Sequence, residues 1–347
     1  MKQLARDQST SDVLAFDVGG ANLKAADGLG GVHAEIFELW RRCGDLAARL
    51  AAIAANWRPR RIVATMTGEI ADCFPDRRAG VEAIVAALEV AAAVAGSELG
   101  IYALDGRIVS ADEARTAPLQ VAASNWHALA RLAATQAACD HGLLIDVGST
   151  TTDIVFLDRL GPLPLASDDA GRMASGELVY TGIERTPVAS LVRSLPLAGQ
   201  WRPLSSELYA RVQDAWLLAG GLPEDPASLD TADGRPATSE AARVRMARMA
   251  LLEPSLVTME EARDAAEHCV AAQARRVARA IRRVLARHRA DPGRIVVSGH
   301  GVALAERAIA LAAVNRPVIR LDRGIGAEAS RAAPAHALAL IALGEIP

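Results

Sequence analysis

The sequence predicts an α/β protein built from two similar lobes, and three observations support this fold class. Seven short apolar segments with strand character alternate with segments in which apolar residues recur at helical spacing. A strand–turn–strand motif occurs twice, once near the N-terminus and once near the middle of the chain. A length of 347 residues corresponds to about two domains of ordinary size, each large enough to bury its own core.

The expected strands, in chain order, are VLAFDV, RIVATM, GIYAL, LLIDV, TDIVFL, RIVVSG and PVIRLD. Helical patterns cover residues 46–55, 81–95, 128–138 and 260–288. Such alternation is typical of a mostly parallel sheet covered by helices, which we therefore expect. Residues 195–236 are rich in Pro and Gly, with Trp201, Tyr209 and Trp216 interspersed, and we expect loops and short helices there.

The segment ACDHG, residues 138–142, resembles the end of a helix that precedes the second motif, so we place the boundary between the lobes there. This predicts an N-terminal lobe of residues 1–139 and a C-terminal lobe of residues 140–333. A C-terminal helix, residues 334–347, could join the first lobe. Because no low-complexity linker separates the halves, we expect the two lobes to pack around a cleft.

Charge and composition argue against several kinds of binding partner. The net charge of -3 and pI of 6.2 lack the basic footprint of proteins that bind nucleic acid or anionic membranes, so we expect small-molecule substrates. The polar N-terminus MKQLARDQSTSD has no apolar signal core, which predicts a soluble, cytoplasmic protein. The four cysteines form no C-x-x-C pair, which argues against zinc sites and disulfides. Helices with exposed aliphatic residues are compatible with a homodimer.

The first motif, FDVGGANLK, places Asp17 at the end of an apolar strand and Gly19 and Gly20 at a tight turn. Without Cβ atoms at the turn, the backbone can approach a phosphate closely. Asn22 and Lys24 follow on the returning strand, where Lys24 would add a positive charge for phosphate oxygens. A surface lysine is the alternative interpretation.

The second motif, IDVGSTTTD, repeats the scheme, with Asp146 at the end of the strand. Its turn supplies one glycine and three hydroxyl side chains, namely Gly148, Ser149, Thr150 and Thr151. Hydroxyl and N–H donors suit phosphate oxygens, and a carboxylate at a strand end can hold hydrated Mg²⁺. We expect Asp17 and Asp146 to hold Mg²⁺, directly or through water. Ordinary turn chemistry would explain a single copy, but two aligned copies favour a binding site.

A third glycine turn follows the strand RIVVSG and precedes a helical pattern. This arrangement brings a ligand to the N-terminus of a helix, so we include Gly299 and Gly301 in the expected binding site. We interpret His300, between them, as a turn residue that could also line the cleft.

The three glycine motifs resemble those of a known protein superfamily. DVGGANLK, DVGSTTTDIV and VVSGHG resemble the phosphate and adenosine elements of the superfamily of acetate and sugar kinases, Hsp70 and actin (ASKHA). The resemblance implies a two-lobed fold with duplicated ribonuclease-H-like domains around a central cleft, each lobe contributing one phosphate hairpin. ATMTGEIADCF, ASNW, IDVGSTTTDIV and YTGIERTP more specifically resemble the tetrahydromethanopterin-linked C1-transfer family, which is related to hydantoinase/oxoprolinase.

Characterised archaeal members of that family act as the furanyl-methanamine synthase of methanofuran biosynthesis. The resemblance therefore implies a transferase of one-carbon metabolism. Its donor would be (5-aminomethyl-furan-3-yl)methyl diphosphate, and its acceptor the phenol oxygen of γ-glutamyl-tyramine, or of a tyrosine equivalent in methylofuran. Diphosphate would leave, and Mg²⁺ would stabilise the departing charge.

Candidates for the remaining roles come from two further segments. Glu69 and Asp72, in TGEIAD, could assist deprotonation of the phenol, or they could cap a helix that opens after Thr67. Arg185, in YTGIERTP, could bind the glutamyl carboxylate or diphosphate, and a structural salt bridge is the alternative. Trp126 and His127 are interpreted as core residues at a helix start.

Two other functions fit the same hairpins. One is an ATP-dependent small-molecule kinase, which would need a catalytic aspartate that the sequence does not identify. The other is a non-enzymatic, nucleotide-dependent assembly or sensor protein of the Hsp70 or actin kind. Because the SGHG turn lacks a clean Gly-Gly adenosine element, ATP is not expected as a substrate, although the cleft could bind it.

Overall fold

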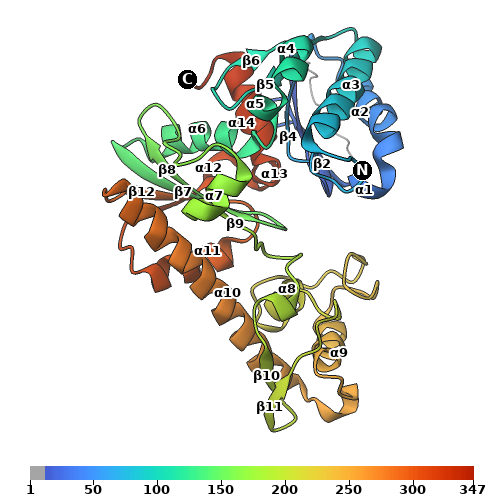
Figure 1. Ribbon diagram of the computed structural model, residues 1–347, viewed down its shortest axis with the longest axis vertical. Helices are drawn as coiled ribbons and strands as arrows, with labels where there is room; N and C mark the ends of the chain where they lie inside the picture. The colour runs from blue at the N-terminus through green and yellow to red at the C-terminus, as the bar shows by residue number, and fades with distance from the viewer. Residues whose placement is uncertain (1–11) are drawn as a thin grey trace, which may run out of the picture.

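The computed structural model of the protein describes residues 12–347 (Figure 1). Two large β-sheets, each covered by helices, form the two lobes, and a smaller outer subdomain extends below them in Figure 1. Residues 1–11, which carry most of the expectation about a signal peptide, lie outside the described residues. Between residues 12 and 347, no helix has both the length and the apolar character needed to cross a membrane.

The first lobe contains a six-stranded sheet and its covering helices. Its strands are β1 (Val13–Val18), β2 (Asn22–Ala26), β3 (Val32–Ile36), β4 (Arg61–Met66), β5 (Glu98–Tyr102) and β6 (Ile108–Val109). Its helical segments are α1 (Leu39–Arg42), η1 (Cys43–Asp45), α2 (Leu46–Trp57), α3 (Arg77–Ala95), α4 (Ala111–Thr116) and α5 (Pro118–Val121). Apolar residues of the strands pack against α2 and α3 in one continuous core.

The second lobe contains a five-stranded sheet. Its strands are β7 (His141–Val147), β8 (Thr152–Asp158), β9 (Leu178–Val179), β12 (Arg294–Ser298) and β13 (Val318–Arg320). Its helical segments are α7 (Asp169–Ser175), η2 (Val188–Ser190), α10 (Met259–His288), α11 (Val302–Ala312), α12 (Leu321–Ile325) and α13 (Ala327–Arg331). Helix α6 (Asn125–Ala137) connects the two sheets and packs against the second.

The two sheets share one strand order. The orders are β3-β2-β1-β4-β5 and β9-β8-β7-β12-β13, with β6 added at the edge of the first sheet. The strands β1, β2 and β3 form an antiparallel meander, and so do β7, β8 and β9. On the other side of β1 lie β4 and β5, and on the other side of β7 lie β12 and β13, all in parallel pairing. This repeated arrangement confirms the duplicated ribonuclease-H-like lobes and the ASKHA fold.

All seven expected strands and all four expected helices are present, but the expectation of mostly parallel sheets is wrong. Parallel pairing is confined to β1–β4–β5 and β7–β12–β13. The short turns after β1 and β7 can only join antiparallel neighbours, because a parallel crossover needs a dozen or more residues. Both sheets are therefore mixed.

The C-terminal helix α14 (Ala333–Leu343) packs on the first sheet. Its Leu338 and Ala339 are buried against Val13, Ala15 and Val63. The same helix also contacts α6, which lies against the second sheet, so the two helices fill the space between the lobes. The division at residue 139 stays a prediction.

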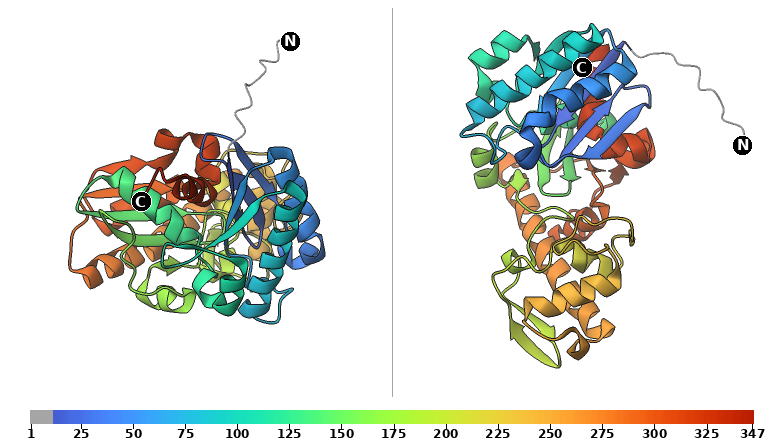
Figure 2. Two further views of the ribbon diagram at one scale, coloured as in Figure 1. Left: turned by 90° about the horizontal axis from the view of Figure 1, so that it is seen from above. Right: turned by 90° about the vertical axis from the view of Figure 1, so that its right-hand side faces the viewer.

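The outer subdomain, residues 193–258, is inserted between η2 and α10 (Figure 2). It comprises the hairpin β10 (Ser194–Leu197) and β11 (Gln200–Pro203), and the helices α8 (Val212–Leu218), α9 (Ser239–Met249) and η3 (Pro254–Leu256). The expectation of loops and short helices missed the hairpin. Helix α10, about 45 Å long at the usual rise per residue, contacts both this subdomain and the second sheet.

A buried ion pair holds α8 to α9 inside the outer subdomain. Arg245 Nε lies 2.7 Å from Asp214 Oδ1, and both side chains are almost fully buried. Asp214 Oδ2 also accepts the backbone N–H of Arg211 at the start of α8. Removing Asp214 would leave the Arg245 charge buried with Asp233, 3.0 Å from its Nη1, as its one remaining ionic partner within residues 12–347.

We predict that Asp214→Ala lowers the free energy of unfolding of this subdomain by about 3 kcal/mol, because an unpaired buried charge costs far more than an exposed pair contributes. Urea unfolding followed by tryptophan fluorescence measures the loss. The control is Glu267→Ala, which removes an exposed partner of Arg307 and should cost less than about 1 kcal/mol. Equal losses in the two variants would contradict a structural role for the buried pair.

Candidate active site

The turn between β1 and β2 is closed by one backbone hydrogen bond. The N–H of Gly19 donates to the carbonyl oxygen of Asn22 over 3.0 Å. A Cβ atom at Gly19 would lie 2.9 Å from that oxygen, so this tight turn requires glycine. Across the hairpin, Asp17 pairs with Lys24, which places a carboxylate and an ammonium group at the same level of the sheet.

The turn between β7 and β8 repeats this geometry. The N–H of Gly148 donates to the carbonyl oxygen of Thr151 over 3.0 Å, and Asp146 lies opposite Asp153. Asp153 therefore occupies the position that Lys24 has in the first hairpin. The duplication extends to individual hydrogen bonds, but the charge opposite the strand-end aspartate is reversed.

The segment YTGIERTP holds the second turn in place. The N–H of Ile183 donates to the carbonyl oxygen of Gly148 over 2.9 Å, and the N–H of Arg185 donates to that of Ser149 over 3.0 Å. A Cβ atom at Gly182 would come within 2.4 Å of the Gly148 oxygen, so the two segments touch backbone to backbone. These contacts explain why this motif accompanies the hairpin.

The third glycine turn lies against β7. Gly299 has a φ of +81°, and its N-terminal neighbour Ser298 pairs with Asp146 in the sheet. The N–H of Gly301 donates to the carbonyl oxygen of Val147 over 3.1 Å, directly before α11 begins.

The two hairpins and this turn enclose a cavity of about 160 Å³, here called the hairpin cavity. Most of the predicted residues line it, namely Asp17, Gly19, Gly20, Asn22, Lys24, Asp146, Gly148, Ser149, Thr150, Thr151 and Gly299. His300 lines it as well, with Thr67, Asn125 and Asp153. Gly301 is packed against Val147 and does not line it.

Asp17, which is buried, and Asp146 and Asp153, which are half-buried, line the hairpin cavity together with the basic residues Lys24 and Arg331. Burial raises the pKa of Asp17, and Lys24 opposes that effect. Burial and the adjacent charge of Asp153 raise the pKa of Asp146 to about 6. Burial also raises the pKa of Asp153, although Arg172, whose Nη2 lies 2.9 Å from Asp153 Oδ1, acts to lower it.

These carboxylates fit a divalent cation. The buried Oδ1 of Asp17 has no hydrogen-bond partner within residues 12–347. Mg²⁺ is commonly held by one or two carboxylates, with water and phosphate oxygens as further ligands. No cluster of three or more acidic, histidine or cysteine side chains in the described chain forms a complete metal site. Asp17 and Asp146 could therefore hold Mg²⁺ only with water or substrate as additional ligands.

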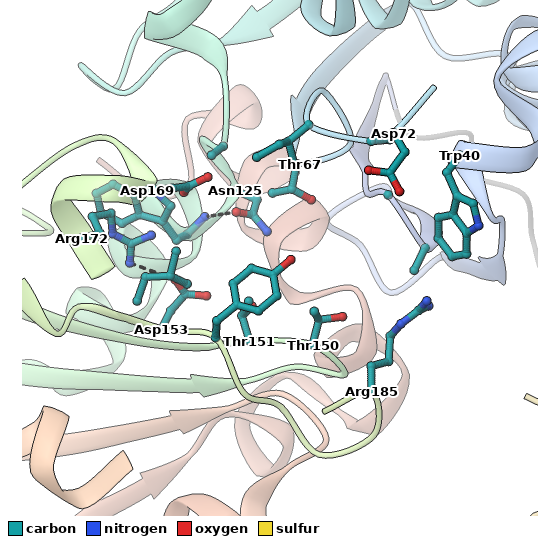
Figure 3. A pocket seen from close by; sticks show the side chains of 18 residues that line it. Trp40, Thr67, Asp72, Asn125, Thr150, Thr151, Asp153, Asp169, Arg172 and Arg185 are labelled. Atoms are coloured by element: carbon teal, nitrogen blue, oxygen red, sulfur yellow. Dashed lines mark hydrogen bonds and ion pairs between the residues drawn. The ribbon is translucent and has the colours of Figure 1, made fainter. Parts of the chain in front are cut away.

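A second cavity of about 350 Å³ adjoins the first and is lined by aromatic side chains (Figure 3). We call it the aromatic cavity. Its residues include Trp40, Ile70, Asp72, Trp126, Asp169, Tyr180 and Arg185. The Arg185 guanidinium stacks 5.0 Å from the ring of Trp40, and Figure 3 shows it extending toward that ring. Arg172 stacks in the same way, 3.9 Å from Trp126.

Glu69 and Asp72 have different environments. Asp72 is exposed and lines the aromatic cavity. Glu69 is buried and lines neither cavity. Neither residue opens a helix, because α3 begins at Arg77 with Asp76 as its N-cap. Arg77 lies 3.6 Å from Glu69 and also pairs with Asp169 of the second lobe, so this arginine bridges the cleft.

A third cavity, the outer cavity, also of about 350 Å³, lies on the other side of the hairpin turns. It contacts residues of the outer subdomain as well as Lys24, Arg185 and His300. His300 Nε2 lies 3.1 Å from Glu184 Oε1. Burial alone would raise the pKa of Glu184, but His300, with smaller contributions from Ser149 and Arg185, outweighs burial and lowers that pKa.

Sequence reasoning missed several residues of the site. Trp40, Tyr180 and Arg172 belong to segments that carry no phosphate-binding pattern, and only the fold brings them to the cleft. Asp153 could have been found, because the duplication aligns it with Lys24. Trp126 was interpreted as a core residue; it is buried and also contributes to the wall of the aromatic cavity.

We predict that the Glu69→Gln variant is more stable than wild type, by an amount that grows as the pH rises. Burial raises the pKa of Glu69 from 4.5 to about 7, against the opposing effects of backbone N–H groups and Arg77. The stability contributed by protonated Glu69 is therefore present in full below about pH 4.5 and is lost as the pH rises through 7. The variant avoids this loss, so it should exceed wild type at pH 8 by about 2 kcal/mol and match it near pH 5.

Urea unfolding at a series of pH values tests this prediction, with Glu82→Gln as the control. Glu82 is an exposed residue of α3, so its replacement removes the same charge without changing a buried group. A Glu69→Gln difference that stays constant from pH 5 to pH 8 would show that Glu69 ionises normally.

The chain is similar to proteins of known family. A family model described as hydantoinase/oxoprolinase matches residues 60–339. A (4-{4-[2-(γ-L-glutamylamino)ethyl]phenoxymethyl}furan-2-yl)methanamine synthase from Methanocaldococcus jannaschii is 31% identical over 255 residues, covering 73% of this chain and 75% of that protein. The synthase of the same name from Methanococcus vannielii is 30% identical over 119 residues, covering 34% and 53%.

Among solved structures, a ROK family glucokinase from Streptomyces griseus, in complex with glucose and AMPPNP, is 13% identical with a TM-score of 0.45. The match covers 94% of this chain and 97% of that one. On the strength of the family model and of the relative from Methanocaldococcus jannaschii, this chain belongs to the hydantoinase/oxoprolinase family.

Proposed function

We propose that the protein is an alkyl transferase that joins (5-aminomethyl-furan-3-yl)methyl diphosphate to the phenol oxygen of γ-glutamyl-tyramine or a tyrosine equivalent. The name that the two relatives share describes a phenoxymethyl-furan, which is the ether that this coupling produces. Their reaction would place this chain in methanofuran or methylofuran biosynthesis.

One structural observation carries the proposal. The hairpin, aromatic and outer cavities meet at Ala21, the residue that lines all three. At the methylene carbon of the donor, three groups must also meet, namely the departing diphosphate, the furan ring and the entering phenol. A kinase for a small acceptor needs room for a nucleotide and an alcohol, and nothing in that reaction calls for the aromatic cavity.

In the proposed reaction, a lone pair of the phenol oxygen forms a bond to the methylene carbon. The bond between that carbon and the bridging oxygen breaks, and its electron pair leaves with diphosphate. The phenol proton is released. Because the furan ring can share positive charge that develops on the carbon, much of the barrier lies in stabilising diphosphate and orienting the reactants.

The hairpin cavity supplies that stabilisation. Turn N–H groups, the hydroxyls of Ser149, Thr150 and Thr151, and the Lys24 ammonium are donors for diphosphate oxygens. Asp17 and Asp146 would hold Mg²⁺, which when bound neutralises charge on the leaving group. The small volume of this cavity suits diphosphate without a nucleoside.

The aromatic cavity suits the donor's furan ring and aminomethyl group. Trp40 and Tyr180 offer ring faces, and the exposed carboxylate of Asp72 forms no ion pair within residues 12–347, so it is available to an ammonium group. Arg185, stacked on Trp40, lies between this cavity and the outer one and can reach diphosphate or the acceptor.

The phenol has an ordinary pKa near 10, so a base that accepts its proton would assist the reaction. Glu69 does not line any of the three cavities. His300 lines two of them, and Glu184 accepts a hydrogen bond from one of its ring nitrogens when that nitrogen is protonated. We therefore propose that the other ring nitrogen of His300, and not Glu69 or Asp72, accepts the phenol proton.

The direct test is incubation of the purified protein with Mg²⁺, the furan diphosphate and γ-glutamyl-tyramine or γ-glutamyl-tyrosine. We expect diphosphate release that depends on the acceptor, an ether of the coupled mass, and loss of both after chelation of Mg²⁺. No turnover with either acceptor, together with ATP-dependent phosphorylation of a small molecule, would replace the proposal by a kinase.

We predict that Lys24→Ala lowers kcat/KM for diphosphate release by about 100-fold, the value of one strong charge-assisted contact. Lys24 forms no ion pair in the described part of the chain, so the midpoint of thermal unfolding should change little. The control Arg60→Ala removes an exposed positive charge outside the three cavities. Parallel losses of activity and stability in Lys24→Ala would assign this lysine a structural role instead.

A further inference from the structure

The outer cavity lies between the first sheet, the second hairpin turn and the outer subdomain. Lys24, Ala34 and Ile36 line it from the first lobe, and Ser149 and Glu184 from the second. The outer subdomain contributes Gln213, Asp225, Ser228 and Asp230, and α13 contributes Arg331. The cavity is continuous with the hairpin cavity, since Ala21, Asn22, Lys24, Ser149, His300 and Arg331 line both.

Charges of both signs line the outer cavity, and some of them are not neutralised by the protein. Asp230 is paired with Arg211 at 2.7 Å, and Glu184 with His300. By contrast, Asp225 and Arg331 take part in no ion pair anywhere in residues 12–347. One oxygen of Asp225 accepts the N–H of Ala227, which leaves its second oxygen for a ligand.

The wall from the outer subdomain also presents an unsatisfied acceptor. Gln213 Oε1 is buried and has no hydrogen-bond partner within the described residues. The backbone N–H of Gln213 donates to the carbonyl oxygen of Glu184, which fixes the start of α8 beside the second hairpin. Because a buried acceptor without a donor is unfavourable, a ligand that donates a hydrogen bond to Gln213 Oε1 would be favoured.

A nucleoside is the obvious alternative occupant of a cavity beside a phosphate site, but the lining does not suit one. No Phe, Tyr or Trp side chain lines the outer cavity; the His300 imidazole is the one ring in its lining, and Ala21, Ala34 and Ile36 are its apolar members. A neutral base would lie among carboxylates and guanidinium groups with no large aromatic ring to stack on. A small ligand that carries both an ammonium and a carboxylate group matches these charges.

We propose that the outer cavity binds the α-amino acid end of the acceptor. In this site Asp225 and Gln213 accept hydrogen bonds from the α-ammonium group, and the Arg331 guanidinium donates to the α-carboxylate. This inference rests on the proposed function, because it assigns a location to the γ-glutamyl group of that acceptor. It makes the outer subdomain and α13 determinants of acceptor specificity.

The arrangement gives the acceptor one direction of binding. Its charged end lies in the outer cavity, and its phenol end reaches past His300 to Ala21, where the three cavities meet and the methylene carbon is placed. The furan part of the donor occupies the aromatic cavity and its diphosphate the hairpin cavity, so the donor does not compete with the amino acid end of the acceptor. An acceptor without its amino acid end should therefore bind weakly while leaving the affinity for the donor unchanged.

Two acceptor analogues separate the two charges. N-glutaryl-tyramine lacks only the α-ammonium group of γ-glutamyl-tyramine, and N-(4-aminobutanoyl)-tyramine lacks only the α-carboxylate. With the furan diphosphate saturating, we expect wild-type kcat/KM to fall at least about tenfold with either analogue, as for one lost charged hydrogen bond. Titration calorimetry of each acceptor measures binding independently of turnover.

The variants Asp225→Asn and Arg331→Gln assign each charge. Asp225→Asn should lower kcat/KM for γ-glutamyl-tyramine about tenfold, but should not lower kcat/KM for N-glutaryl-tyramine further. Arg331→Gln should likewise lower kcat/KM for γ-glutamyl-tyramine about tenfold, and should not lower it further for the aminobutanoyl analogue. The controls Glu253→Gln and Arg279→Gln make the same charge changes at exposed positions outside the cavity. Circular dichroism and thermal unfolding confirm that each variant is folded.

Equal kcat/KM for all three acceptors, or variants that lose activity equally with each of them, would overturn the assignment and leave the transferase intact. Acceptor binding that depends on both charges, without diphosphate release, would instead overturn the proposed function alone. Displacement of bound γ-glutamyl-tyramine by adenosine would assign the outer cavity to a nucleoside.

Discussion

The structure depends on one electrostatic constraint: three carboxylates, one buried and two half-buried, are gathered where the ends of two duplicated hairpins meet. Asp17, Asp146 and Asp153 are all held at positions where burial raises their pKa values, and Lys24 and Arg172 are the basic residues that oppose this effect most directly. Such a cluster is costly in an empty protein and becomes favourable when cations and donors complete it. Under the proposed function, Mg²⁺ would complete this cluster together with diphosphate.

The surrounding structure keeps the two hairpins facing each other. Arg77 of the first lobe pairs with Asp169 of the second across the cleft, and α14 packs against both the first sheet and α6. A chain of side-chain hydrogen bonds connects the outer subdomain to the second turn. Trp216 donates to Gln273, and Gln273 donates to Thr181 and to the carbonyl oxygen of Gly182, which touches the Gly148 turn.

The sequence predicted the parts of the site that are local in the chain. Each hairpin is a short stretch whose strand, glycine and hydroxyl pattern follows from turn geometry, so most of the predicted phosphate residues line one cavity. The mixed sheets were missed because apolar alternation does not distinguish parallel from antiparallel neighbours. Trp40, Asp225 and Arg331 were missed because each comes from a segment with no motif, and only the fold carries it to the cleft.

In alkyl transfer, the bond broken at this site joins carbon to oxygen, and diphosphate is the leaving group. We would label with ¹⁸O the oxygen that bridges the methylene carbon and phosphorus of the furan diphosphate, and analyse the products by mass spectrometry. If the protein is an alkyl transferase, all of the label leaves in diphosphate and the ether carries only the unlabelled phenol oxygen. Label retained in the furan product would show cleavage between oxygen and phosphorus, and would contradict alkyl transfer.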